Sequence, residues 1–225
     1  MTELAEGYRV VRSAAPVREQ AVRVLRNLLT EKFQPGERIT ETTVCELLGA
    51  SRTTVREALR QLETEGLVEM VPGKGPTVAT VDEHDIRDLY EIREVLESFA
   101  IMLFIERATK EEWSRLAEAF RDLERAHATG EASRVITGKQ AFYDVLFEGA
   151  HNNSISVLAQ RIYWRVARVR LASLTAERIR DGIEELRTVH ELMKSRDVHQ
   201  AQDAYAIHMQ NARKAAILAV RRSAA

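Results

Sequence analysis

The sequence contains one cysteine, Cys45, among its 225 residues. Because no intrachain disulfide can form, the sequence excludes a secreted scaffold stabilised by disulfides and favours a reducing compartment. Long hydrophobic runs are also missing, since stretches such as residues 99–105 are far shorter than the ~20 residues of a membrane-spanning helix. The amino-terminal residues lack the basic start and apolar core of a signal peptide. We therefore expect a cytoplasmic protein with no membrane partner.

An excess of charge of either sign is absent as well. The chain carries 33 Lys and Arg against 34 Asp and Glu, and its net charge is −1 at pH 7. Residues 1–81 contain no aspartate, and their basic and glutamate side chains balance. An interaction with nucleic acid must therefore be argued from where the charges lie and not from their sum.

What the chain does have is helical periodicity in its first third. Hydrophobic residues recur every three or four positions, and the breaks at Pro35-Gly36 and Gly49 separate three segments of this kind. Ser51 is a favourable N-cap for the third segment. The pattern predicts helices over 17–31, 41–48 and 51–66.

The period then changes to that of strands. Residues 67–71 and 77–81 are rich in β-branched side chains, and Pro72-Gly73-Lys74-Gly75-Pro76 between them is typical of a turn. Three helices followed by a β-hairpin predict a winged helix-turn-helix.

Helical periodicity returns from Asp82 and continues to the end of the chain. Thr109 and Glu112 have the spacing of a capping box, which marks one helix start. We expect helices over about 82–108, 110–129, 132–150, 154–172, 176–195 and 198–221. The predicted fold class is mainly α, with a flexible arm (1–14), a winged helix-turn-helix domain (15–81) and an all-α helical bundle (82–225).

The third helix carries the features expected of a DNA-reading element. Arg52, Arg56 and Arg60 lie at four-residue steps on one face, opposite an apolar face. The planar guanidinium group can bind guanine edges or phosphates with two hydrogen bonds. A solvent-exposed charged face is the alternative reading of this stripe, since such stripes are common on surface helices.

Two further features support the DNA-binding interpretation. Thr53 and Thr54 lie in the first turn of the third helix, where side chains enter the groove in helix-turn-helix docking. Gly73 and Lys74 lie at the tip of the hairpin, where a small residue allows close approach to DNA and lysine adds a positive charge.

These residues resemble a known family. The run from Pro35-Gly36 through Ser51-Arg52-Thr53-Thr54-Val55-Arg56 to Glu65-Gly66-Leu67-Val68 is similar to the GntR family of regulators, and the chain from Leu89 onward resembles the FCD effector domain of its FadR branch. The resemblance implies that the DNA contacts are Arg52, Thr53, Thr54, Arg56 and Gly73. Thr42 stands where the family often has arginine, so the operator sequence cannot be transferred.

The resemblance to FCD domains also implies a divalent metal held by one Asp and three His. His190 and His208 match two of these ligands, but Lys139 stands in place of the Asp and Tyr143 in place of the remaining His. A protonated lysine has no lone pair and repels a dication. We therefore expect no metal or other cofactor; His190 and His208 are metal ligands only if a degraded site persists.

We hypothesise that Lys139 instead holds the carboxylate of an organic acid. Tyr143, His190 and His208 would orient this effector by hydrogen bonds, with help from Arg93. In the alternative reading, the Lys139 side chain extends to solvent and both histidines are core residues.

The sequence as a whole predicts a homodimeric transcriptional regulator, a repressor, whose affinity for double-stranded operator DNA is modulated by a small carboxylate effector. A helical metal-dependent enzyme and a protein-interaction module, each carrying a winged helix, are the alternatives. A further arginine cluster is expected to divide among pocket lining, salt bridges and a subunit interface: Arg161, Arg165, Arg168 and Arg170.

Overall fold

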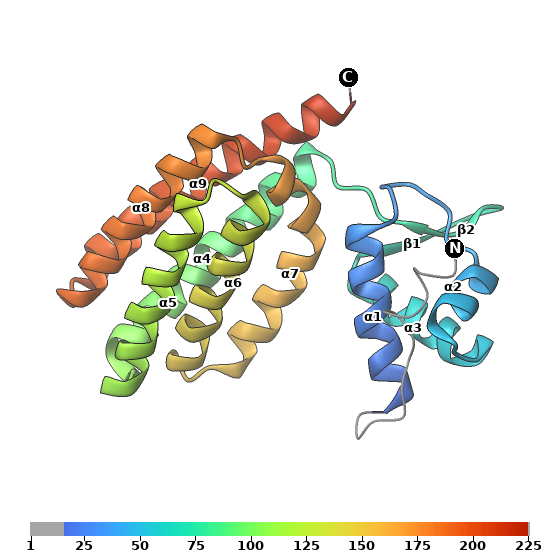
Figure 1. Cartoon of the computed structure of the whole chain (residues 1–225), viewed down its shortest axis with the longest axis horizontal. Coiled ribbons are helices and arrows are strands. Elements are labelled where there is room, and N and C mark those ends of the chain that lie inside the picture. The colour runs from blue at the N-terminus through green and yellow to red at the C-terminus, as the bar shows by residue number, and fades with distance from the viewer. Residues whose placement is uncertain (1–15, 225) are drawn as a thin grey trace. The chain divides into compact units, whose positions relative to one another are not determined.

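A computed structural model describes residues 16–224 of the chain (Figure 1). The flexible arm predicted over residues 1–14 lies outside the described residues. The structure divides into two compact units, one ending at Val81 and the other beginning at Asp82, and each is described by itself.

The first unit is a winged helix-turn-helix, which confirms this part of the predicted fold class. Within residues 16–81, three helices precede a two-stranded antiparallel hairpin. The elements are α1 (Val17–Glu31), α2 (Glu41–Leu48), α3 (Arg52–Thr64), β1 (Val68–Val71) and β2 (Gly75–Val78).

The second strand begins two residues earlier than predicted. Gly75 pairs with Val71 and Pro76 pairs with Met70. The turn is short because Gly73 and Gly75 adopt φ values of 75° and 82°, which a residue without a Cβ reaches at no steric cost. The chain therefore reverses within fewer residues than the glycine- and proline-rich segment suggests.

The segment before α2 lies along the free edge of β2, an arrangement that was not predicted. The backbone N–H of Ile39 donates to the carbonyl oxygen of Pro76 at 2.8 Å, and that of Val78 donates to Glu37 at 2.9 Å. The Ile39 side chain is buried. These bonds attach the wing to the helices.

The second unit is all-helical, as predicted. The six helices described here begin and end within three residues of the predicted positions: α4 (Glu83–Arg107), α5 (Lys110–Ala128), α6 (Ala132–Gly149), α7 (Asn153–Ala172), α8 (Ala176–Lys194) and α9 (Val198–Ala224). The Thr109–Glu112 capping box is formed at the start of α5.

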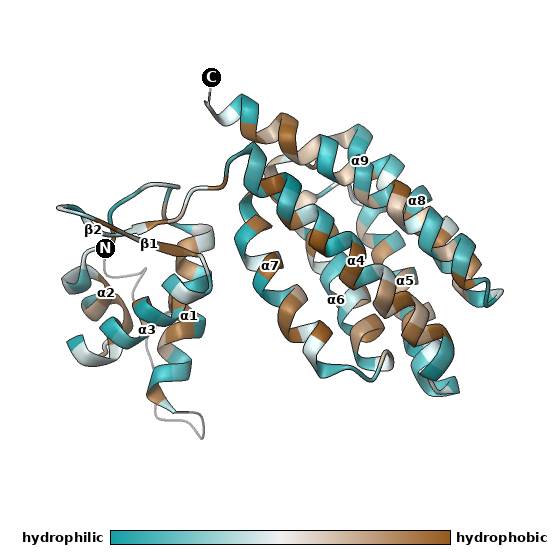
Figure 2. Ribbon diagram, turned by 180° about the vertical axis from the view of Figure 1, so that it is seen from behind, coloured by the Kyte–Doolittle hydropathy of each residue, from teal (hydrophilic) through white to brown (hydrophobic). Residues whose placement is uncertain are grey.

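Helix α4 lies at the centre of this unit and packs against α6, α7, α8 and α9. Its buried positions recur along the helix, and Figure 2 shows hydrophobic and hydrophilic stretches alternating along the helices. Because α4 and its neighbours surround a common interior, polar side chains that point inward from different helices can meet there.

Candidate functional site

The DNA-facing candidate is helix α3, which has two distinct faces. Val55, Ala58, Leu59 and Leu62 are buried against the rest of the first unit. The arginine side chains of the predicted stripe, Arg52, Arg56 and Arg60, are exposed. The Ser51 hydroxyl accepts a hydrogen bond from the backbone N–H of Thr54 at 3.2 Å, which fixes the start of the helix.

Arg56 is anchored to helix α2 by an ion pair. Its Nε atom lies 2.8 Å and 2.9 Å from the two carboxylate oxygens of Glu41, and the Arg56 side chain is 60% exposed. The hydrogen bond from Arg56 lowers the pKa of Glu41. The ion pair holds the guanidinium group of Arg56 at the surface that α2 and α3 share.

The wing tip is open. A Cβ placed on Gly73 or Gly75 would meet no atom within 4 Å. The Lys74 Nζ donates to the carbonyl oxygen of Gly36 at 2.7 Å.

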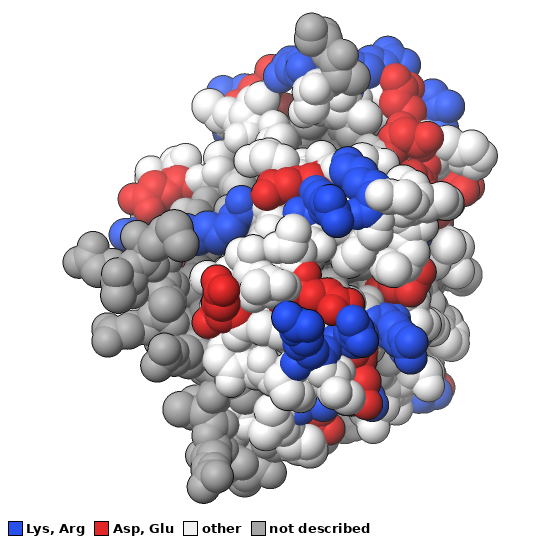
Figure 3. Space-filling view, turned by 90° about the vertical axis from the view of Figure 1, so that its right-hand side faces the viewer, with Lys and Arg blue, Asp and Glu red and all other residues white. Residues whose placement is uncertain are grey.

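In the face drawn in Figure 3, basic side chains gather in groups with acidic side chains beside them, in keeping with the balanced composition.

Sequence reasoning left Arg38 out of the candidate DNA contacts. Arg38 is exposed, and its backbone forms a β-bridge with Thr77 of the wing. Its position in the sequence, directly after Pro35-Gly36-Glu37 at the break between two helices, could have marked Arg38 as a candidate.

The second candidate site is a pocket among five helices of the second unit. The cavity is small, with a volume of about 30 Å³ for the centres of water-sized molecules, and it is partly open to solvent. Four of the predicted effector-binding residues, Arg93, Lys139, Tyr143 and His208, line it. The other polar side chains of the wall are Tyr90, Arg170, Ser173 and Arg178.

His190, the fifth predicted effector-binding residue, does not line the pocket. Its ring stacks on Phe120 at a centroid distance of 4.6 Å, and burial lowers its pKa. His190 and His208 both face the interior from successive helices, but they have different surroundings.

Two of the four cations of the pocket are neutralised by carboxylates. Arg93 Nε donates to Glu97 at 2.9 Å, with both side chains almost fully buried. Arg178 binds both oxygens of Glu185, at 2.9 Å and 2.5 Å. The positive charge of the pocket therefore comes from the remaining two cations, Lys139 and Arg170.

Lys139 and Arg170 have no carboxylate partner among the described residues. The guanidinium of Arg170 lies 4.8 Å from the centroid of the Tyr163 ring. The Lys139 side chain is buried, and burial together with Arg178, Arg170 and Arg93 lowers its pKa to about 7. The pocket is therefore electropositive.

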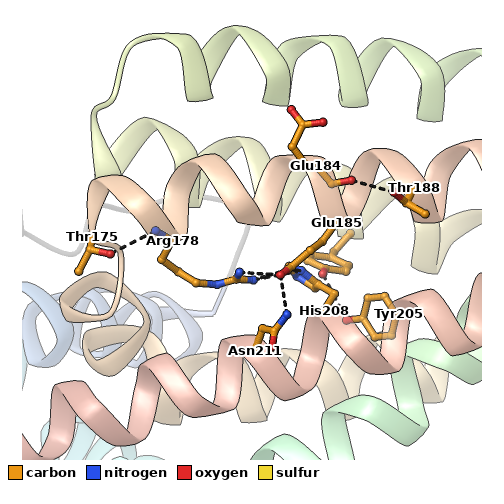
Figure 4. Close-up of polar contacts among 9 residues, drawn as sticks. Thr175, Arg178, Glu184, Glu185, Thr188, Tyr205, His208 and Asn211 are labelled. Carbon is orange, nitrogen blue, oxygen red and sulfur yellow. Dashed lines mark hydrogen bonds and ion pairs between the residues drawn. The ribbon is translucent and has the colours of Figure 1, made fainter.

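Glu185 connects α8 and α9 beside the pocket (Figure 4). Its carboxylate accepts hydrogen bonds from His208 Nδ1 at 2.6 Å and from Asn211 Nδ2 at 2.8 Å, in addition to Arg178. Burial alone would raise the pKa of Glu185, but these bonds outweigh it and lower the pKa to about 2. Burial, Lys139 and Arg178 lower the pKa of His208 to about 3, so its ring is neutral with the proton on Nδ1.

The pocket residues do not fit a divalent metal of the kind implied by the resemblance to FCD domains. The amine of Lys139 stands in the place of a carboxylate, and His208 Nδ1 is committed to Glu185. Within residues 16–224, no group of three or more His, Cys, Asp or Glu side chains is arranged to hold a metal ion.

The arginine cluster of α7 contributes in two ways. Arg170 lines the pocket, and Arg165 forms a salt bridge with Asp85 at 3.2 Å. Arg178 and Glu185 were not identified from the sequence. They lie seven residues apart on one face of α8, but no local motif marks this face as the one that borders the pocket.

A winged helix-turn-helix with an exposed arginine face places the protein in the class of DNA-binding regulators. Comparison with protein families then identifies the group. Residues 17–78 match the bacterial regulatory proteins of the gntR family, and residues 88–211 match the FCD domain. The chain belongs to the GntR family of transcriptional regulators and carries an FCD domain; it is not an enzyme.

Individual relatives agree with this assignment. The chain is 30% identical over 178 residues to the uncharacterised HTH-type transcriptional regulator YdhC of Bacillus subtilis, covering 78% of this chain and 80% of YdhC. It is 26% identical over 194 residues to the HTH-type transcriptional repressor GlaR of Escherichia coli, covering 81% of this chain and 87% of GlaR.

The fold is also that of solved structures. The structure of McbR/YncC from E. coli aligns with a TM-score of 0.76 at 22% identity, covering 88% of this chain and 95% of that one. A GntR regulator from Rhodococcus sp. RHA1 aligns with a TM-score of 0.74 at 23% identity, covering 89% and 97%.

Proposed function

We propose that this GntR-family regulator is a repressor that releases its operator when a small organic acid binds in the pocket of the FCD domain. The observation that carries the proposal is the pair of cations, Lys139 and Arg170, that line the pocket without a carboxylate partner among the described residues. An uncompensated cation in a buried site is unfavourable, so an anion that enters the pocket gains binding free energy.

The acid's carboxylate would lie between Lys139 and Arg170. Arginine binds a carboxylate with two hydrogen bonds, which fixes the orientation of the acid as well as its charge. The Tyr143 hydroxyl and the His208 ring would contact the rest of the acid, since both line the same wall. His190 is not part of this proposal because it stacks on Phe120.

The repressor assignment rests on the similarity to the repressor GlaR. The homodimer rests on geometry: Ile92, Val95 and Phe99 form a stripe along α4 and are 50%, 70% and 42% exposed. Such a stripe suits burial against a second copy, and a two-fold dimer matches a pseudo-palindromic operator.

We expect the protein to act in the cytoplasm, where its DNA is. No helix in residues 16–224 is long and apolar enough to cross a membrane.

Fluorescence anisotropy tests the proposal. A duplex is selected by the full-length protein from a random-sequence library, and its affinity is measured with and without a panel of small carboxylic acids. We expect at least one acid to weaken binding, by a factor of roughly 5 to 150 for a typical coupling free energy. Tighter binding with acid would overturn the release mechanism, and no effect across the panel would count against the effector pocket.

A salt titration of binding to random duplex separates the regulator from the protein-interaction alternative. Phosphate contacts release counterions, so the affinity should fall steeply as salt rises. Lys74→Ala should reduce the slope by about one unit, since it removes one contact of the wing with phosphate. A flat salt dependence would favour the interaction module.

A further inference from the structure

Lys139 differs in kind from the other cations of the pocket. Among the described residues that line it, the remaining cations are arginines, and a guanidinium does not lose its proton in proteins. An amine that loses its proton is a nucleophile. Lys139 therefore brings chemistry to the pocket that an arginine cannot supply.

The surroundings of Lys139 hold this amine in a reactive state. The charged and titratable groups around it come from six helices: Tyr90 and Arg93 (α4), His127 (α5), Tyr143 (α6), Arg170 (α7), Arg178 and Glu185 (α8), and His208 (α9). Two carboxylates lie near these groups, and each is already bound by an arginine: Glu185 by Arg178, and Glu97 by Arg93.

A desolvated lysine beside other cations is the arrangement that activates an amine for addition to a carbonyl group. The pKa of Lys139, lowered to about 7 by burial and the neighbouring arginines, leaves about half of the amine unprotonated at pH 7. Lysines exposed to water are almost entirely protonated at that pH.

The Lys139 amine packs against α8 at Gly182, which is buried. A Cβ placed on Gly182 would lie 3.4 Å from Lys139 Nζ and 3.4 Å from the Arg178 guanidinium. Because residue 182 has no side chain, the amine can lie this close to α8, and a ligand reaches it from the pocket that Lys139 lines. Burial raises the pKa of Tyr143, so its hydroxyl on the same wall keeps its proton. Because the Tyr205 hydroxyl donates to Glu97, Tyr143 donates this proton to the Tyr205 oxygen, and its own oxygen remains free to accept a hydrogen bond.

We propose that Lys139 forms a reversible imine with the carbonyl carbon of a small 2-oxo acid whose carboxylate binds Arg170. This inference rests on the proposed function, because it assumes that an organic acid enters the pocket. It also accounts for both uncompensated cations at once: the carboxylate neutralises Arg170, and the neutral imine removes the charge of Lys139. A carboxylate alone would have to neutralise both.

The reaction balances without a co-reactant. The lone pair of Lys139 Nζ attacks the carbonyl carbon, the π electrons move to the oxygen, and this oxygen takes up the proton that the nitrogen releases. The resulting carbinolamine loses its hydroxyl group and the second nitrogen proton as one water, which leaves the C=N bond. Addition of water regenerates the amine and the 2-oxo acid, so formation of the imine is reversible.

Reductive trapping tests the proposal on the full-length protein. Pyruvate is the probe and L-lactate the control, since lactate keeps the carboxylate but has a hydroxyl group in place of the carbonyl. Sodium cyanoborohydride reduces an imine to a stable amine. We expect the peptide that contains Lys139 to gain the mass of pyruvic acid less one oxygen atom, with lactate giving no adduct.

Two variants and an internal control sharpen the readout. Lys139→Arg keeps the cation and removes the nucleophile, so it should abolish the adduct while the protein still binds lactate, as followed by its melting temperature. Arg170→Gln keeps the amine and should reduce the yield of trapping. Lys194, whose side chain is 51% exposed, is an internal control, and at pH 7 it should react at least about tenfold more slowly than Lys139 because it lacks the buried, cationic surroundings that activate an amine.

The outcomes are distinct. An adduct confined to Lys139 supports the imine. Equal thermal stabilisation by pyruvate and lactate with no adduct overturns the imine and leaves the carboxylate pocket standing. Adducts spread evenly over surface lysines overturn the imine as well. If neither acid stabilises the protein and none is trapped, the imine fails and the proposed effector pocket loses its support for small acids.

Discussion

His208 Nδ1 lies 2.6 Å from the carboxylate of Glu185 and joins helix α9 to helix α8 at the wall of the pocket. A neutral imidazole that donates to a carboxylate holds both side chains in one orientation. Because burial and the neighbouring cations lower the pKa of His208 to about 3, the folded protein resists protonation of this ring. The pair therefore makes stability depend on pH.

Acidification should destabilise the protein through His208. Below its ordinary pKa of 6.5 the unfolded chain binds a proton on this ring, whereas the folded protein does so only near pH 3. Between pH 7 and pH 5 this difference should lower the free energy of unfolding by roughly 2 kcal/mol. Glu185 lowers the free energy of unfolding further at lower pH, because its pKa is 4.5 in the unfolded chain and about 2 in the folded protein.

Urea denaturation at pH 7 and pH 5 measures this effect. The variant His208→Asn should have a smaller difference between the two values than the wild type. His199→Asn is the matched control, since His199 is exposed on the same helix and does not line the pocket. Equal losses in the wild type and in His208→Asn would contradict the prediction.

Replacing the buried amine should stabilise the protein in the absence of an effector. Lys139→Met keeps a similar volume and removes a cation that has no carboxylate partner among the described residues, so the free energy of unfolding at pH 7 should rise by about 1–4 kcal/mol. The folded pKa of Lys139 is about 7 against an ordinary value of 10.5. The gain should therefore be largest near and below pH 7 and shrink as the pH approaches 10.5.

Denaturation at pH 7 and pH 10 checks the sign and the trend. Lys194→Met should change stability little, because this lysine is half exposed and its ion pair with Glu191 lies at the surface. A less stable Lys139→Met protein at pH 7 would show that Lys139 makes a favourable interaction in the empty pocket.

The sequence predicted the elements well because its periodicity is strong and its breaks are marked. Gly130, His151 and Arg196, at the predicted breaks, all adopt positive φ. The edge formed by residues 36–39 was missed because it is too short to show the alternation of a strand.

The pocket was only partly predictable. Lys139, Tyr143 and His208 could be placed together because they occupy positions that match a family pattern, while His190 matched the same pattern and lies against Phe120. The contacts that Glu185 of α8 makes with His208 and Asn211 of α9 depend on how these two helices rotate against each other. A single sequence carries no direct record of that rotation.

The contact between α4 and α6 should be sensitive to a single methyl group. A Cβ added to Gly149 would lie 2.4 Å from the ring of Phe104, which is fully buried. Gly149→Ala should therefore reduce the free energy of unfolding by about 1–3 kcal/mol, since the ring or the helix must shift. Gly182→Ala is the control, because its Cβ would make ordinary contacts at 3.4 Å. If both variants are equally stable, the helices are less closely packed at Gly149 than the structure indicates.

The recognition face of α3 can be tested through the ion pair between Arg56 and Glu41. Arg56→Ala should weaken binding to the selected operator by about 10- to 100-fold, the range for loss of one bidentate contact with a base. Binding to random duplex should change less, because phosphate contacts carry most of it. Anisotropy titrations with both duplexes at one salt concentration give this comparison.

Two further variants separate a DNA contact from a structural role of Arg56. Glu41→Gln keeps the side-chain length and weakens the hold on the guanidinium, so operator affinity should stay the same or increase. Arg23→Ala removes an exposed arginine from α1, outside the recognition helix, and should have a much smaller effect. If Glu41→Gln weakens binding as much as Arg56→Ala, the ion pair matters by fixing α2 to α3. Arg56 would then be a positioning residue and not a DNA contact.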